Sequence, residues 1–520
     1  MLKTGKLKSA LALFLVAAVS LAFTLTVPAE NVSAATVTKP AQVTGLKATY
    51  KGHYDYTVKW SKAKRATQYQ VYRSTSKNGT YTKVKTLTGT SYAVYAPPGK
   101  NYYFKVRGSK KITQYYNSTT KKWVNSKPAA KNWKGKKTRK KDIYGLFSSK
   151  LHVCKEAKAT AVASGVPAYW NEEINNSLES YRSHSTSDVG FVYFTDAHWG
   201  PKTRSKATNA QHSPAIMQYL YDTLGLKMCV FGGDMIAGTH KQDVSSALNE
   251  MQDFVEKMGF HSSKKRPDPV TQEDNLYNVM FTSGNHDFNT SSSGSEAAIP
   301  EDAIYRILHE EQTNHFETAA QNGRCSYADD SAHKIRYIQI YFDAYLNNSN
   351  PASAGTNFDL SYPSDEELNW LKETVQDPSL DEDWAIVFFT HAYWSFGKKA
   401  TCPTEVELRT ESGERLGNYL LKLEADENTK ADIALWMTGH THRDLDRVIS
   451  SDTDSIVITC TNCDTFNDGS ASRKSGYWGG CTMVKGHDTE QVLELVQIDK
   501  TNRKIYLTRV GAGKDREFNY

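Results

Sequence analysis

Phe281-Thr-Ser-Gly-Asn-His-Asp-Phe288 is the stretch on which the interpretation of this sequence depends. It places an amide, an imidazole and a carboxylate side by side at Asn285, His286 and Asp287. The apolar run before them predicts a buried strand over 279–281. Gly284 allows the chain to turn sharply and to approach another group closely. Taken alone, the stretch is also compatible with an ordinary Asn/Asp turn.

Four further stretches share this layout. Apolar runs over 191–194, 228–231, 385–389 and 433–437 each end in residues of metal-ligating type. Ligands of open α/β sheets bind outside the carboxyl ends of strands, so we expect these side chains to lie close together. Five of the 15 histidines fall in the motifs, which makes a chance arrangement a poor explanation. The residues are Asp196 and His198, Asp234, His391, and His440 and His442.

In this order the motifs resemble the signature of the calcineurin-like metallophosphoesterases, which reads DxH, GD, GNH(D/E), a lone His and GHxH. All five blocks occur in order between about residues 190 and 445. The resemblance implies an α/β (α+β) metallophosphoesterase sandwich with mixed sheets flanked by helices. It also implies a metal-dependent hydrolase that acts on phosphoric ester bonds.

The resemblance assigns the motif side chains to two divalent metal ions. Oxygen and nitrogen donors without a thiolate suit Mn²⁺, Fe or Zn²⁺. Two such ions would clamp a phosphoryl group and lower the pKa of a bridging water, whose hydroxide would attack phosphorus. Asp196, His198 and His442 would hold one ion, Asn285, His391 and His440 the other, and Asp234 would bridge them.

His286 lies outside this ligand set. By resemblance it lies beside the phosphate, where it would stabilise developing charge or protonate the leaving group. Asp287 would hold the ring of His286 in orientation. His286 and Asp287 are therefore the predicted catalytic pair.

Residues 1–35 predict a signal peptide. A lysine-containing start precedes an apolar stretch over 10–27, and 32–35 offers small residues for cleavage. The apolar stretch is long for a signal, so a retained membrane anchor stays open as an alternative. No other stretch approaches the ~20 apolar residues that a membrane helix needs. We expect a secreted or cell-surface protein without a transmembrane span in the mature chain.

Residues 36–127 predict a separate all-β module. Apolar and aromatic residues alternate with polar ones over 54–60, as is typical of a strand. The run over 96–106 resembles the corner before a late strand of fibronectin type III domains. Tyr102 would be the corner tyrosine and Trp60 the core tryptophan. The resemblance implies a small immunoglobulin-like sandwich, with some other small sandwich as the alternative.

The remainder divides into a predicted linker and a predicted catalytic domain. The lysine-rich residues after the module lack an apolar period, which predicts a solvated basic linker over 128–165. A calcineurin-like domain would span 166–520. We expect a helix over 168–183 to open it and a hairpin of strands over 492–498 and 504–510 to close its sheet.

Charge is divided unevenly along the chain. Residues 36–150 contain 27 Lys and Arg against 2 Asp and Glu, a net charge of +25, whereas residues 151–520 contain 34 against 54, a net charge of −20. A dense cationic arm binds polyanions through counterion release. We therefore expect residues 36–150 to contact an anionic cell-wall polymer, with a simple spacer as the alternative. Nucleic acid is the less favoured substrate, because the acidic part would repel it.

The motifs leave the substrate open. The leading interpretation is an exported two-metal phosphoesterase that hydrolyses small phosphate esters and is tethered by the β module. A phosphodiesterase acting on nucleotides or phospholipids is an alternative, since nothing in the motifs separates monoesters from diesters. A non-enzymatic surface adhesion protein is another, although all seven expected ligands are present. Seven cysteines are too few for a disulfide scaffold, and a bridge between Cys463 and Cys481 stays open.

Overall fold

The computed structural model describes most of the chain outside the N-terminus. The predicted signal peptide, Cys463 and Cys481 lie outside the described residues. Among the helices that are described, none is long and apolar enough to cross a membrane. The described residues are 37–52, 55–96, 100–154, 165–184, 190–199, 207–208, 212–238, 243–259, 277–289, 298–310, 317–320, 323–341, 363–392, 410, 412, 414–452, 454–461, 466–467, 483–484 and 486–520.

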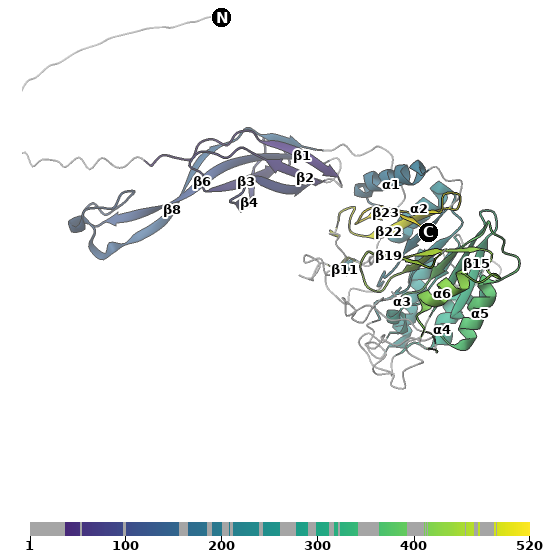
Figure 1. Ribbon diagram of the computed structural model, residues 1–520. Coiled ribbons are helices and arrows are strands. Elements are labelled where there is room, and N and C mark those ends of the chain that lie inside the picture. The colour runs from purple at the N-terminus through teal and green to yellow at the C-terminus, as the bar shows by residue number, and fades with distance from the viewer. Residues whose placement is uncertain are drawn as a thin grey trace, which may run out of the picture.

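An elongated all-β part comes first and a larger part with helices and sheets follows it (Figure 1). The larger part contains two main sheets, with strand orders β13-β12-β10-β22-β23-β24 and β14-β15-β16-β17-β18-β20-β19. The first sheet consists of β10 (Phe191–Phe194), β12 (Cys229–Phe231), β13 (Val279–Phe281), β22 (Val492–Asp499), β23 (Lys504–Gly511) and β24 (Arg516–Asn519). The second consists of β14 (Thr318–Ala320), β15 (Cys325–Asp330), β16 (Ile335–Ile340), β17 (Ala385–Phe389), β18 (Asp432–Thr438), β19 (Leu445–Ser450) and β20 (Ser455–Cys460). A short separate pair joins β11 (Ala207–Thr208) and β21 (Phe466–Asn467).

The two sheets pack face to face through alternate residues of their central strands. Phe191 contacts Tyr337 edge-on with ring centroids 5.4 Å apart, and Tyr193 stacks on Phe389 at 6.1 Å. Val192, the residue between them, points to the opposite face, because successive side chains of a strand alternate. Both faces of these strands are therefore buried, which is why they are continuous apolar runs.

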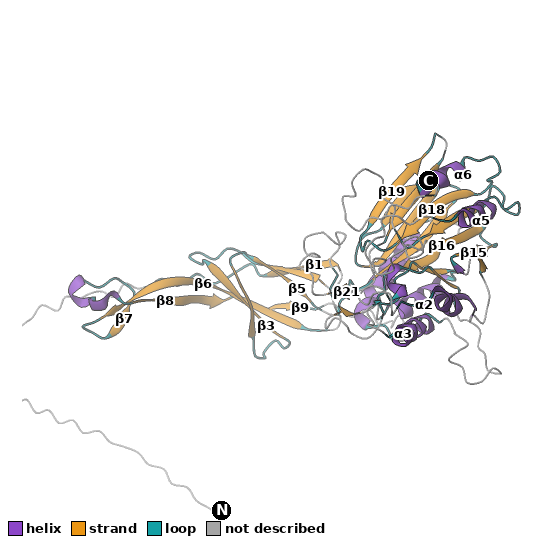
Figure 2. Cartoon of the chain, turned by 90° about the horizontal axis from the view of Figure 1, so that it is seen from below, coloured by secondary structure: helices purple, strands orange, loops and turns teal. Residues whose placement is uncertain are grey.

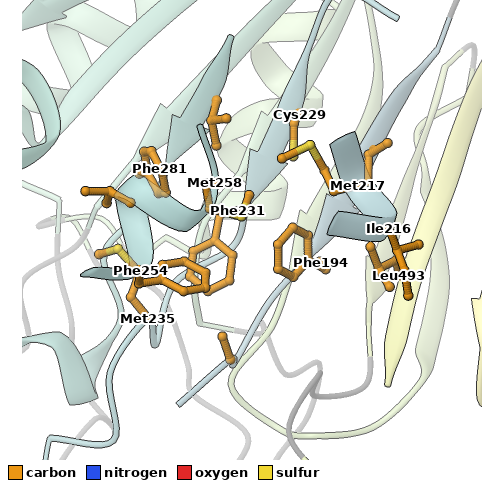
Figure 3. Close-up of a cluster of buried hydrophobic side chains, with 14 of the residues drawn as sticks. Phe194, Ile216, Met217, Cys229, Phe231, Met235, Phe254, Met258, Phe281 and Leu493 are labelled. Carbon is orange, nitrogen blue, oxygen red and sulfur yellow. The ribbon is translucent and has the colours of Figure 1, made fainter. Parts of the chain in front are cut away.

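Helices cover the outer faces of both sheets. Side chains of the first sheet such as Phe194 and Phe231 pack against Met217 and Phe254 of two helices (Figure 3). This side carries η3 (Ala168–Trp170), α1 (Asn171–Ser183), α2 (Ser213–Leu224), α3 (Val244–Lys257), α4 (Glu301–Tyr305) and the π-helical η8 (Arg306–Glu310). The second sheet is covered by α5 (Asp365–Val375) and α6 (Leu416–Glu424). The predicted sandwich of mixed sheets flanked by helices is confirmed.

The strands that carry the motifs are neighbours in the two sheets. β10, β12 and β13 run parallel side by side, and so do β17 and β18. Their carboxyl ends therefore meet at one edge of the sandwich. The predicted opening helix and the hairpin of β22 and β23 are also confirmed, but the hairpin does not close the sheet, because β24 pairs with β23 and forms its edge.

The N-terminal part is all β, as predicted. Trp60 is buried, and its ring contacts Tyr69 edge-on at 5.6 Å. Tyr102 begins β6 and packs against the same core. One sheet contains β1 (Lys47–Gly52), β2 (Asp55–Lys59) and β5 (Ser91–Tyr95). The other contains β3 (Gln68–Ser74), β4 (Thr82–Leu87), β6 (Tyr102–Asn117), β7 (Lys122–Val124), β8 (Thr138–Phe147) and β9 (Leu151–Val153), with η1 (Ala130–Asn132) and η2 (Lys134–Lys136) between β7 and β8.

The lysine-rich segment differs from the solvated linker that its composition predicts. Its residues form β8, which pairs antiparallel with β6, and β9 then pairs with the start of β6. β6 is 16 residues long, so its outer half runs beyond the sandwich as a ribbon with β8 (Figure 2). Backbone pairing holds this ribbon together, and none of its residues over 110–141 belongs to the module's hydrophobic core, so it needs no apolar period. The domain boundaries themselves stay predictions.

The two parts contact each other through polar and aromatic groups. The hydroxyl of Tyr50 donates to Glu172 Oε1 at 2.7 Å. The ring of Tyr95 lies 4.1 Å from the ring of His487, centroid to centroid. Nε2 of His487 lies 3.6 Å from Asp55 Oδ1. The β module therefore contacts the larger part through the end that carries β1, β2 and β5.

Candidate metal centre

The predicted ligands come together in two groups at the carboxyl ends of the motif strands. Within each group, one ligand atom per residue lies within 4.8 Å of every other. Asp234 belongs to both groups, as the resemblance implies for a bridging residue. Asn285 Oδ1 lies 3.0 Å from Nδ1 of His440, which places Asn285 at the second group. The groups are Asp196, His198, Asp234 and His442, and Asp234, His391 and His440.

Two distances in the first group match the spacing of ligands around one ion, and a third is longer. Nε2 of His442 lies 3.1 Å from Asp196 Oδ1 and 3.2 Å from Nε2 of His198. Nε2 of His198 lies 3.9 Å from Asp234 Oδ2. Ligands that each bind an ion at ~2.1 Å are separated from one another by ~3.0–3.4 Å in octahedral or tetrahedral geometry. A cation held by both imidazole nitrogens would be compatible with the 3.2 Å between them.

In the second group, a backbone carbonyl orients His391. Its Nδ1–H donates to the carbonyl of Gly232 at 2.7 Å, which leaves Nε2 as the ring nitrogen that faces the cluster. That Nε2 lies 3.2 Å from Asp234 Oδ2. Histidines that bind metals usually donate their other ring N–H in this way, because the bond fixes the tautomer.

Two buried atoms of the cluster lack the partners that buried polar atoms normally have. Asp196 Oδ1 and His391 Nε2 make no hydrogen bond within the described residues, although other cluster atoms lie near them. An unsatisfied buried polar group costs ~1–3 kcal/mol. A divalent cation would satisfy both atoms. The residues present therefore fit the metal ions that the resemblance implies.

The protonation states also suit a cation. Burial, together with neighbouring imidazoles, lowers the pKa of His198 to about 3 and of His440 to about 4, so both are neutral at pH 7. Burial would raise the pKa of Asp196, but His442 outweighs it and lowers the pKa to about 2. Burial likewise opposes protonation of His391, but Asp234 raises its pKa to about 9. The carboxylates thus favour positive charge at this point, which a bound metal would supply.

Five of the seven predicted ligands have a left-handed backbone. Such a conformation costs a residue with a side chain roughly 1–2 kcal/mol. Backbone strain of this kind collects at functional sites, where the surrounding structure enforces it. The loops after β10, β12 and β18 thus turn abruptly to aim their side chains inward. The φ angles are 55° for Asp196, 44° for His198, 57° for Asp234, 66° for His440 and 56° for His442.

Two motif positions require glycine, because a carboxylate oxygen lies too close to leave room for a Cβ atom. A Cβ atom on Gly284 would lie 2.2 Å from Asp234 Oδ1, and one on Gly439 would lie 2.5 Å from Asp196 Oδ2. Gly284 has an ordinary φ of −112°, so its role is to leave space for the carboxylate of Asp234. The sequence predicts a close approach at Gly284, and the structure identifies the approaching group.

Asp287 does not contact the ring of His286, so its predicted role is wrong. Its buried carboxylate accepts backbone N–H bonds from Gly284 at 2.7 Å, Asp234 at 3.0 Å and Ile236 at 3.1 Å. These donors lie on the loops after β13 and β12. Asp287 therefore joins the two loops and is a positioning residue.

His286 faces the cluster from its edge. Its Nδ1–H donates to the carbonyl of Ala237 at 2.8 Å, so this carbonyl orients the ring in place of Asp287. Its Nε2 lies 3.9 Å from Asp234 Oδ2, and 26% of the side chain is exposed. The ring centroid lies 4.6 Å from that of His198. His286 is therefore beside the candidate metal centre and accessible from solvent.

Sequence reasoning missed several groups that hold the cluster. The hydroxyl of Thr195 donates to Asp196 Oδ2 at 2.8 Å, and the backbone N–H of His440 donates to the same oxygen at 2.9 Å. Thr195 precedes the first motif, so its position was a usable signal. The carbonyls of Gly232 and Ala237 are backbone groups, and no residue type identifies them.

Comparison with known proteins agrees with this geometry. The family model described as calcineurin-like phosphoesterase matches residues 190–444. Residues 190–444 are a calcineurin-like phosphoesterase domain. The domain starts at β10 and ends two residues after His442, so it contains both ligand groups. This domain makes the chain a candidate metal-dependent hydrolase.

The calcineurin-like domain follows a β module whose structural neighbours are fibronectin type III domains. One is the crystal structure of an Fn3-like protein from Clostridium thermocellum, with 23% identity over 24% of this chain and 100% of that chain and a TM-score of 0.16. Another is the solution structure of the sixth fibronectin type III domain of a human protein, with 16% identity over 25% of this chain and 97% of that chain and a TM-score of 0.17. No curated protein matches the chain.

Proposed function

We propose that this chain is an exported phosphoesterase that uses two metal ions to hydrolyse small phosphate esters. The observation that carries the proposal is the shared position of Asp234, whose carboxylate belongs to both ligand groups. A carboxylate has two oxygens and can bind two ions at once. Export rests on the predicted signal peptide over 1–35.

The bound ions would supply a nucleophile near neutral pH and positive charge for the phosphoryl oxygens. The chain itself supplies the proton. Because Nδ1–H of His286 is engaged by Ala237, its Nε2 is the ring atom that faces the cluster. When protonated, Nε2–H would donate to the leaving oxygen as the ester bond breaks. Asp287 holds the loops that carry Asp234 and His286, so it acts on the reaction through position.

Metal stoichiometry tests the shared carboxylate. We expect purified protein loaded with Mn²⁺ or Zn²⁺ to bind two ions, His442→Ala and His391→Ala to bind about one each, and Asp234→Ala to bind none. Asp330→Ala is a matched control. Asp330 lies outside the motifs, and its Oδ2 is 2.8 Å from Nδ1 of His333. This variant should bind two ions. Equal loss in His442→Ala and Asp234→Ala would show that Asp234 is not shared.

A substrate panel tests the reaction. Chromogenic monoesters and diesters, each with added Mn²⁺, Zn²⁺ or Mg²⁺, would separate a phosphomonoesterase from a phosphodiesterase. We expect hydrolysis of monoesters that disappears in Asp234→Ala. Faster hydrolysis of diesters would favour the phosphodiesterase alternative. Metal-replete protein without activity on any ester would favour a non-enzymatic adhesion protein.

We also propose an anionic cell-wall polymer as the partner of residues 36–150. Their net charge of +25 far exceeds what solubility needs, whereas residues 151–520 carry −20. The cationic part would hold the enzyme at the polymer while the acidic part remains available to small esters.

A further inference from the structure

The outer end of the β module concentrates positive charge on a free-standing ribbon. We name residues 110–141 the tip ribbon; it contains the outer half of β6, β7, η1, η2 and the start of β8. In both views it lies at the end of the molecule farthest from the helices of the larger part, and no other described helix or strand lies beside it (Figures 1 and 2). It contains 12 Lys and Arg and no Asp or Glu. All of these cations except half-buried Lys110 are exposed.

The tip ribbon is ordered by its strand pairing. Gln114 pairs with Arg139, and Thr113 pairs with Lys140, across β6 and β8. The side chains continue this pairing: Nε of Arg139 donates to Gln114 Oε1 at 2.9 Å, and Nζ of Lys140 donates to Thr113 Oγ1 at 2.8 Å. Alternate residues of a strand lie on one face ~6.6–6.8 Å apart, so Arg139 and Lys141 share a face and Lys140 occupies the other. Positive charge therefore repeats along both faces.

Two aromatic rings in the tip ribbon each have a cation of the ribbon over one face. The guanidinium of Arg139 lies 4.5 Å from the centre of the Trp123 ring, and Nζ of Lys127 lies 4.9 Å from the centre of the Trp133 ring. The negative face of each ring attracts the cation above it and so restrains it. Proteins that bind single-stranded nucleic acid use open aromatic faces on which bases stack. A base that stacked on either of these two faces would first have to displace the cation.

We propose that the tip ribbon is the docking surface for a linear phosphodiester polymer without bases, of the poly(glycerol phosphate) type. Charge complementarity carries the proposal: the ribbon has restrained cations on both faces, no acidic residue, and two tryptophan rings that each already hold a cation over one face. The proposal rests on the proposed attachment of residues 36–150 to an anionic polymer, and it places that attachment in 32 residues at the far end of the module. The larger part, which contains both ligand groups, lies at the other end of the molecule from the tip ribbon (Figure 1).

The experiment compares charge-neutralised variants of the full-length chain. One variant removes four cations of β8 and its approach, and a second removes four exposed lysines of the turn, in case the first disturbs the strand. A matched control removes four exposed lysines of the sandwich. The variants are Lys137→Gln with Arg139→Gln, Lys140→Gln and Lys141→Gln; Lys121→Gln with Lys131→Gln, Lys134→Gln and Lys136→Gln; and Lys47→Gln with Lys59→Gln, Lys83→Gln and Lys85→Gln.

The probes are a poly(glycerol phosphate) chain and an oligothymidylate with the same number of phosphates, each titrated across a salt series. Neutralising four contacts should weaken binding of poly(glycerol phosphate) by on the order of 10²-fold and reduce the slope of log K against log salt by roughly 3. The sandwich control should change little. Hydrolysis of a small ester should be unchanged in all three variants, which separates this inference from the phosphoesterase proposal.

Three results would overturn the inference. If the sandwich control weakens binding as much as the ribbon variants, attachment stands but depends on net charge alone. If oligothymidylate binds clearly more tightly, and replacement of Trp123 by Ala removes the preference, the tip ribbon is a nucleic-acid surface. If the wild-type chain binds neither polymer at low salt, both the attachment and its location are wrong.

Discussion

Replacing Gly284 by alanine adds one methyl group at the point where the two ligand loops meet. The new Cβ would lie 2.2 Å from Asp234 Oδ1 and 2.4 Å from the backbone nitrogen of Asp234, whereas ordinary contact begins at 3.4 Å. The loops must therefore separate by up to 1.2 Å, the difference between 3.4 Å and 2.2 Å. Rotation of the side chain cannot relieve this, because one of the atoms is backbone. A displacement of 1 Å at a catalytic group can cost ~10²-fold in rate.

We expect Gly284→Ala to lower kcat/KM for a small phosphate ester by on the order of 10²-fold and to weaken metal binding. Overpacking would also lower the free energy of unfolding by ~1–3 kcal/mol. The assay combines kcat/KM, metal content after gel filtration, and the thermal midpoint. Gly89→Ala is the control, because its Cβ would have Leu87 Cδ1 as the nearest atom at 3.9 Å. Wild-type activity and metal content in folded Gly284→Ala would refute the reasoning.

Three other predictions test the proton donor, the second close glycine and the contact between the two parts. His286→Ala should lower kcat by ~10²-fold at unchanged metal content, with a smaller loss for a nitrophenyl ester; equal losses for both leaving groups would exclude protonation. Gly439→Ala should reduce metal binding, because the added Cβ would lie 2.5 Å from Asp196 Oδ2; elemental analysis showing two metal ions bound per chain would contradict this. Burial opposes protonation of His487, but Asp488 and Asp55 raise its pKa above 6.5. The ion pairs of His487 therefore stabilise the fold below pH 6.5, and this stabilisation is lost as pH rises through the folded-state pKa. Asp55→Asn should therefore lower the thermal midpoint more at pH 6 than at pH 9, and an equal loss at both would show that the pair does not titrate.

The sequence alone was sufficient to predict which residues gather at the candidate site. The motif strands are fully buried, so their sequences are continuous apolar runs. Polar residues occur again only where these strands end. His391 illustrates this: one histidine directly after the run over 385–389 was informative because the run ends there. The order of the strands in the sheets did not need to be known, since parallel neighbours bring their carboxyl ends to one edge.

The sequence did not predict how the site is held. Asp287 was assigned to the ring of His286 because the two are adjacent, yet its carboxylate turns to backbone N–H groups of two loops. Neighbours along a chain in a tight turn point in different directions, so adjacency says little about contact. The carbonyl of Ala237, which does orient His286, has no sequence signature, because every residue has a carbonyl.

The lysine-rich segment shows the same division. Composition determined its charge and its exposure, and both are found in the structure. Only the tertiary structure decided that it is a strand, because its pairing partner is the outer half of β6, which lies earlier in the chain. The length of β6 could not be predicted from the periodicity of its sequence. Local sequence patterns thus indicate whether a residue is buried, whether it adds to a charged surface and whether it lies in a turn. Pairing between distant segments and the direction of backbone groups arise only when those segments meet, and they determined which groups orient the side chains of the candidate site.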